Sequence, residues 1–168
     1  FEQAIHMNNS LSAAYHQLGK CYQRIGEADK AIGLLRQVVQ HKPRQVPPRL
    51  DLGFAYLEQD HIQQARDLFM DVSNEKPDNG RATLGLAHCA FQEGQWEAAA
   101  HLAMTALNQT GANFAVYYLL GQASKLANTA EGIDALKKAD ALLEKSIESN
   151  PEQPEGYYLR GEVCFVQE

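Results

Sequence analysis

The sequence repeats itself with a period of 34 residues, and this regularity restricts the fold more than any other feature. A first column of small residues, spaced by 34 positions and finally by 40, is Gly19, Gly53, Ala87, Gly121 and Gly161. Two further columns with the same steps are Ala31, Ala65, Ala99 and Ala139, and Pro43, Pro77, Gly111 and Pro151. A period of about 20 to 50 residues is typical of proteins that stack one short unit many times.

Each repeat is predicted to form two helices. In the first repeat, Leu18 precedes the small residue Gly19 and Tyr22 follows it by three positions, which is the spacing of one helix face. A second helix follows, in which Leu35 lies four positions after Ala31. The residues predicted to turn the chain between the two helices are Gly26, Asp60 and Gly94, and a proline or glycine closes each unit.

The small columns have a physical reason. Two antiparallel helices approach closely only where their side chains are short. A single helix pair cannot bury its apolar face, and stacking several pairs supplies a continuous core. The pattern therefore predicts an all-α fold, a right-handed α-solenoid of antiparallel helix pairs.

The repeated unit resembles the tetratricopeptide repeat, whose signature has an aromatic residue, a leucine-glycine pair, a tyrosine, alanines and a final proline. The first repeat matches at Tyr15, Leu18, Gly19, Tyr22, Ala31, Leu35 and Pro43. The second has Arg49 in place of the aromatic residue, and the third is weaker, with Thr83 and Ala90 at signature positions. The fourth matches again at Tyr117, Leu120, Gly121, Ala139, Leu143 and Pro151.

The columns divide the chain into successive repeats, and we expect these to form one array cut from a longer protein. Residues 1–11 are predicted to end a preceding repeat, with Asn9 where proline is usual, and residues 154–168 to form the first helix of a truncated one. Between them we expect repeats at 12–45, 46–79, 80–113 and 114–153. The fourth has six extra residues, predicted to lie between Gly121 and Ala139 as a protruding hairpin.

The resemblance implies that the first helix of each pair lines a concave groove that binds a protein or peptide. The residues at these positions, called the groove set here, are His16, Lys20, Arg24, Leu50, Phe54, Leu57, Arg81, Leu84, His88, Phe91, Tyr118, Gln122 and Lys125. An apolar middle beside a basic first repeat predicts a partner with apolar anchors and an acidic end. Two alternatives stay open: Leu57 and Phe91 pack into the core, or Lys20 and Arg24 are simply solvated.

Two specialisations of the family are disfavoured. The clamp for the terminal carboxylate of heat-shock chaperones needs lysine, asparagine and arginine at positions that here hold His16, Lys20, Asp51, Arg81 and Gly85. Asp51 would repel a carboxylate and Gly85 has no donor. The asparagine ladder of sugar-transferring members is replaced by Gln17, Asp51, Gly85, Leu119 and Leu159.

Composition narrows the function further. A net charge of -6 and a pI near 5.5 disfavour nucleic acid as the partner, and no apolar stretch is long enough to insert in a membrane. The widely spaced Cys21, Cys89 and Cys164 favour a reducing compartment such as the cytoplasm, and neither a catalytic motif nor a cofactor or metal motif is recognisable. We therefore expect an interaction module rather than an enzyme. The alternatives are a regulatory or substrate-presenting arm of an enzyme, and self-association through exposed solenoid ends.

Overall fold

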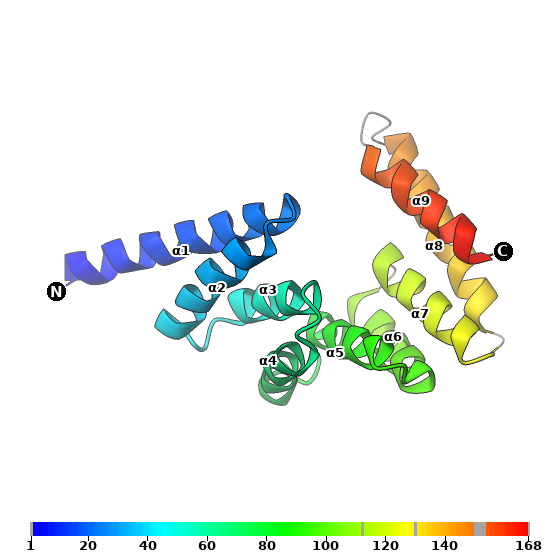
Figure 1. Ribbon diagram of the computed structural model, residues 1–168, viewed down its shortest axis with the longest axis horizontal. Helices are drawn as coiled ribbons and strands as arrows, with labels where there is room; N and C mark the ends of the chain where they lie inside the picture. Colours follow the sequence, from blue (N-terminus) through cyan, green and yellow to red (C-terminus); the bar gives the residue numbers. More distant parts are fainter. Residues whose placement is uncertain (1, 112, 130, 150–153, 168) are drawn as a thin grey trace. The chain divides into compact units, whose positions relative to one another are not determined.

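The computed structural model describes residues 2–111, 113–129, 131–149 and 154–167, and every regular element in these ranges is an α-helix (Figure 1). In chain order the helices are α1 (Glu2–Arg24), α2 (Ala28–His41), α3 (Val46–Leu57), α4 (Ile62–Glu75), α5 (Gly80–Gln92), α6 (Trp96–Thr110), α7 (Phe114–Leu126), α8 (Glu131–Ser149) and α9 (Pro154–Gln167). The predicted all-α class is confirmed.

The helices form two compact units, Phe1–Pro77 and Asp78–Glu168. Inside each unit every helix packs against the next one in the chain, from α1 to α4 in the first unit and from α5 to α9 in the second. First helices of successive repeats also touch, α1 with α3 and α5 with α7. This is the packing expected of stacked helix pairs.

Four turns between paired helices share one geometry. Each has a residue with positive φ, and these residues are 34 positions apart: Gly26, Asp60, Gly94 and Asn128. The left-handed region suits glycine and is tolerated by Asp and Asn, whose short polar side chains fit it. The predicted turns at Gly26, Asp60 and Gly94 are confirmed, and the fourth turn keeps the same period.

The extra length of the fourth repeat is not in a protruding hairpin between Gly121 and Ala139. A Cβ at Gly121 would lie 2.5 Å from Cγ of Leu136, so these two residues face each other as Gly53 and Phe69 do. Phe69 follows Gly53 by 16 positions and Leu136 follows Gly121 by 15, which leaves no room for an insertion. The additional residues instead lengthen α8, which has 19 residues against 14 in α4.

The position of Gly132 explains why the small-residue column, which aligns Ala139 with Ala65, does not give the packing register of α8 against α7. A Cβ at Gly132 would lie 2.8 Å from the backbone nitrogen of Lys125, so the backbones of α8 and α7 come close to each other at this glycine. Ala139, which shares the small-residue column in the sequence, lies two turns further along α8 and is buried. The close contact belongs to Gly132 because only a residue without a side chain fits there.

The start of the chain also differs from the sequence prediction. The structure has one continuous helix, α1, across Asn9, where we predict a boundary between repeats. Asparagine is a weak helix former but leaves the backbone hydrogen bonds intact, whereas the proline usual at this position would break them.

Each unit has its own apolar core. In the first unit, Ile32 and Leu35 of α2 pack with Leu52 and Ala55 of α3. In the second unit, one buried cluster joins α5, α6, α7 and α8, and another joins α8 to α9 through Leu143 and Val163. These cores hold the first helices in place and so determine which of their side chains reach the solvent.

Candidate functional site

The groove set falls into three classes of exposure. Its exposed members are Lys20, Arg24, Arg81 and Lys125. Its partly buried members are His16, Phe54, Leu84, His88, Phe91, Tyr118 and Gln122. Its buried members are Leu50 and Leu57. All four exposed members are basic, two in each unit.

Most apolar members of the groove set pack inside their own units. Leu50 is only 3% exposed and Leu57 only 6%. The ring of Phe54 lies 4.9 Å from that of Phe69, and Phe91 packs edge-on against Trp96 at 5.1 Å. The structure thus favours the alternative in which Leu57 belongs to the core, while Phe91 remains partly exposed beside its packing partner.

Polar pairs join the first helices of the first unit. Nε2 of His16 lies 2.6 Å from Oδ2 of Asp51, which is buried, and Gln23 donates to Glu58 at 2.7 Å. Asp51 is therefore engaged with a histidine rather than open to a ligand.

Apolar residues take the same positions two repeats later. Adding 68 to the pairs of the first unit gives Leu84 with Leu119, and Phe91 with Leu126. Leu119 is buried, whereas Leu126 is 52% exposed. The first-helix face of the second unit is therefore more apolar than that of the first.

Two titratable members of the groove set have shifted pKa values. Burial lowers the pKa of His88, which favours a neutral imidazole. Burial raises the pKa of Tyr118, and the nearby Glu162 carboxylate raises it further. Both side chains thus stay uncharged at neutral pH, and the positive charges of the groove set are those of its lysines and arginines.

Polar contacts replace the signature aromatic residue in the middle repeats. Arg49 donates two hydrogen bonds to Glu75, the one from Nη1 to Oε1 being 2.8 Å, and the hydroxyl of Thr83 donates to Gln109 at 2.8 Å. Both pairs connect the start of one helix to the end of its partner, 26 residues later. The sequence signal for these contacts is a polar residue, Arg49 or Thr83, at the position that holds Tyr15 and Tyr117 in the other repeats.

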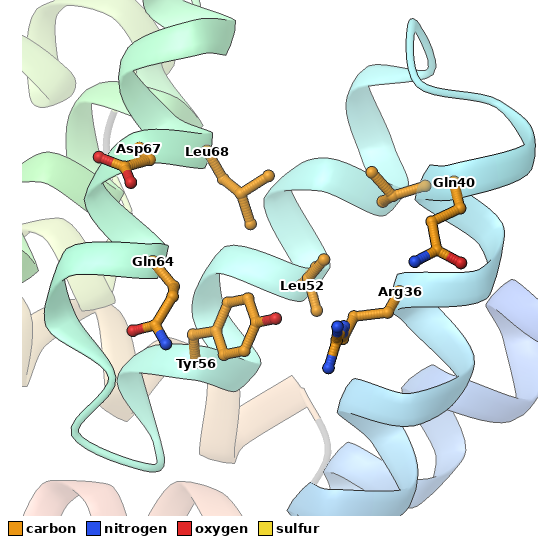
Figure 2. A pocket seen from close by; sticks show the side chains of 8 residues that line it. Arg36, Gln40, Leu52, Tyr56, Gln64, Asp67 and Leu68 are labelled. Atoms are coloured by element: carbon orange, nitrogen blue, oxygen red, sulfur yellow. The ribbon is translucent and has the colours of Figure 1, made fainter.

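Two pockets lie on the side of the second helices. One, the Tyr56 pocket, has a volume of about 290 Å³ and is lined by Arg36, Val39, Gln40, Leu52, Tyr56, Gln64, Asp67 and Leu68. Figure 2 shows the Tyr56 ring extending into it from α3. The other, the Ser124 pocket, has a volume of about 270 Å³ and is lined by Glu97, Ala100, His101, Met104, Leu120, Ser124 and Thr129. The groove set contributes to neither pocket.

Neither a metal centre nor a membrane span is found among the described residues. In those ranges no three His, Cys, Asp or Glu side chains come together as metal ligands. No helix of the described part is long and apolar enough to cross a membrane.

Comparison with known proteins addresses the fold and the family. A tetratricopeptide repeat family model matches residues 26–79 and 63–123. A comparison with curated proteins finds no significant match.

Solved structures of low sequence identity share the fold. The tetratricopeptide protein TTC0263 of Thermus thermophilus has a TM-score of 0.72 at 12% identity, covering 92% of this chain and 99% of that one. MamA from Desulfovibrio magneticus RS-1, residue 41 to the end, has a TM-score of 0.58 at 20% identity, covering 90% and 82%. PilF of Pseudomonas aeruginosa has a TM-score of 0.62 at 18% identity, covering 94% and 69%.

The family model spans residues 26–123, more than half of the chain, and the structural similarities extend beyond it at both ends. The helix pairs, the turns that recur every 34 residues and the close contacts at small residues are typical of the tetratricopeptide repeat. The chain belongs to the tetratricopeptide repeat family, an all-α helical solenoid fold that generally serves as a non-enzymatic scaffold for protein interactions.

Proposed function

We propose that the chain binds an acidic protein or peptide segment through the first-helix faces of its units. The observation that carries the proposal is the charge of the exposed groove set: Lys20 and Arg24 in the first unit, Arg81 and Lys125 in the second. The whole chain has a net charge of -6, so basic residues on these faces are a local departure from the acidic average. Such a departure favours an oppositely charged partner.

Apolar anchors of the partner belong on the second unit. Its first helices expose Leu126 and leave Leu84 and Phe91 partly exposed, whereas the matching positions of the first unit hold the polar pairs of His16 and Gln23. Partly exposed leucine and aromatic side chains beside basic residues suit a segment that alternates apolar and acidic side chains.

The test is the binding of a fluorescent synthetic peptide of alternating leucine and aspartate, measured by fluorescence anisotropy. The paired changes Lys20→Glu with Arg24→Glu, and Arg81→Glu with Lys125→Glu, are each expected to weaken binding about three- to tenfold, since an exposed charge contributes roughly 0.2–1 kcal/mol. Raising the salt concentration is expected to weaken it too, because exposed charges are screened.

Lys137→Glu is the matched control, because Lys137 is exposed on the second helix α8 and lies outside the groove set. This variant is expected to bind the peptide like the wild type. Equal affinity for a peptide with asparagine in place of aspartate, or unchanged affinity in both folded groove variants, would contradict the proposal.

A further inference from the structure

The Tyr56 pocket combines apolar walls with one basic side chain. Val39, Leu52 and Leu68 line it from α2, α3 and α4 in turn. Arg36 of α2 also lines the pocket, is exposed, and forms no ion pair or hydrogen bond with the described residues of the chain. A ligand that enters the pocket can therefore reach a positive charge beside an apolar surface.

The acidic residue that lines the pocket is directed away from this charge. Asp67 accepts a hydrogen bond from the side-chain amide of Gln63 at 2.7 Å, one turn earlier on α4. Figure 2 shows the Asp67 carboxylate pointing away from Leu52, whereas the Arg36 guanidinium and the Tyr56 hydroxyl point toward each other beside that leucine. A guanidinium matches the geometry of a carboxylate, and a phenol hydroxyl can donate to the same group. The space between them is therefore suited to a carboxylate.

The equivalent pocket of a later repeat lacks this charge. Three lining residues of the Tyr56 pocket have equivalents 68 positions later, which is two repeats, and these line the Ser124 pocket: Met104 for Arg36, Leu120 for Leu52 and Ser124 for Tyr56. The leucine is kept, but neither lysine nor arginine lines the Ser124 pocket. A pocket thus forms at this place in the repeat without a basic residue, so packing alone does not explain Arg36.

Two glutamines border the Tyr56 pocket on opposite sides. Gln40 extends from α2 and Gln64 from α4, and both are exposed (Figure 2). Their side-chain amides can donate and accept hydrogen bonds with the peptide groups of a bound chain. Because such groups lie on both sides, the pocket suits a segment that crosses it rather than one that ends inside it.

We propose that the Tyr56 pocket binds an internal segment of a partner protein in which a leucine stands next to an acidic residue. The leucine packs against Leu52 and Leu68, and the carboxylate pairs with Arg36. Such an apolar anchor beside a charged contact is a common way to recognise a peptide. The pocket lies on the side of the second helices and shares no residue with the groove set, so neither proposal depends on the other.

The test is an NMR titration of the ¹⁵N-labelled chain with the blocked peptide acetyl-Glu-Leu-Glu-amide. We expect saturable shifts of the amides of Val39, Leu52, Tyr56 and Leu68. The uncharged acetyl-Gln-Leu-Gln-amide is expected to bind about two- to fivefold more weakly, the range for one exposed ion pair. Acetyl-Glu-Ala-Glu-amide is expected to bind at least about threefold more weakly, because it lacks the apolar anchor.

Arg36→Met gives the pocket the residue that the chain itself has two repeats later, the exposed Met104, so this variant is expected to fold. It is expected to weaken binding about two- to fivefold. Arg44→Met removes an equal charge from an exposed position of the same unit outside the pocket, and it is expected to bind like the wild type.

Four results would overturn the proposal. Two are undiminished binding by folded Arg36→Met and equal affinity for the glutamine peptide. A third is a set of shifts that gathers on the first-helix faces instead of the pocket, which would leave the groove proposal standing. The fourth is saturable shifts at the pocket with N-acetyl-leucine but not with the blocked peptide, because the pocket would then capture a chain end.

Discussion

The glycines inside the helices of this chain are not all required by close packing. A Cβ at Gly53 would lie 2.7 Å from ring atoms of Phe69, so the glycine lets α3 and α4 approach each other. Gly33, in the middle of α2, is exposed and has no atom within 4 Å of such a Cβ. Only the first is required by packing.

We predict opposite effects for the two alanine substitutions. Gly53→Ala is expected to lower the free energy of unfolding by about 1–3 kcal/mol, because the added methyl group overpacks the contact with Phe69. Gly33→Ala is expected to raise it by about 0.5–1 kcal/mol, because alanine favours a helix interior. Urea unfolding followed by circular dichroism measures both, and a stabilised Gly53→Ala variant would disprove the packing role.

At the level of elements, an ion pair between Arg49 and Glu75 connects α3 to α4 where the repeat signature has an aromatic residue. Arg49, at the start of α3, is 5% exposed and is held by Glu75 at the end of α4. The hydrogen bonds from Arg49 lower the pKa of Glu75, and those to Glu75 raise the pKa of Arg49. Because a buried guanidinium without a counter-charge is unfavourable, Glu75 stabilises the helix pair through its charge.

Glu75→Gln is therefore expected to lower the thermal unfolding midpoint at pH 7. The lowered pKa means that the stabilisation by Glu75 is present above the ordinary value of 4.5 and is lost as the pH falls through the folded-state value. The gap between wild type and variant should close below that pH. Glu148→Gln, an exposed position on α8, is the control. A gap that stays constant from pH 7 to pH 3 would contradict the assignment.

At the level of the whole molecule, each of the two units has its own core. In the second unit the buried cluster of Ala87, Ala103, Leu119, Leu120 and Ala135 draws on four consecutive helices. A core of this kind can support folding without the rest of a repeat array, since repeats contact mainly their neighbours.

We predict that a fragment of residues 78–168 folds alone, with a helical circular dichroism spectrum and a cooperative thermal transition. A fragment of residues 95–168 lacks α5, and with it Ala87 of the buried cluster, so it is expected to lose most of that cooperativity. Calorimetry of the two fragments measures the difference. A non-cooperative transition in the longer fragment would show that the unit is not an independent core.

The amino-acid sequence by itself determined the repeat, because its columns reflect contacts inside one helix pair. Gly19, Gly53 and Gly121 recur wherever two paired helices must touch, and Gly26, Asp60 and Gly94 recur wherever the chain must turn. Such local requirements repeat with the period of the unit and can be read directly. They were sufficient to predict the fold and the family.

Only the tertiary structure decided which side chains remain available. Leu50 and Leu57 lie at positions predicted to line the groove but are buried in the first unit. Asp51 is engaged by His16, which lies 35 residues earlier in another repeat. Burial and side-chain pairing depend on contacts between residues that are distant in the chain. The period of the sequence shows which positions are equivalent, but not which residues contact each other.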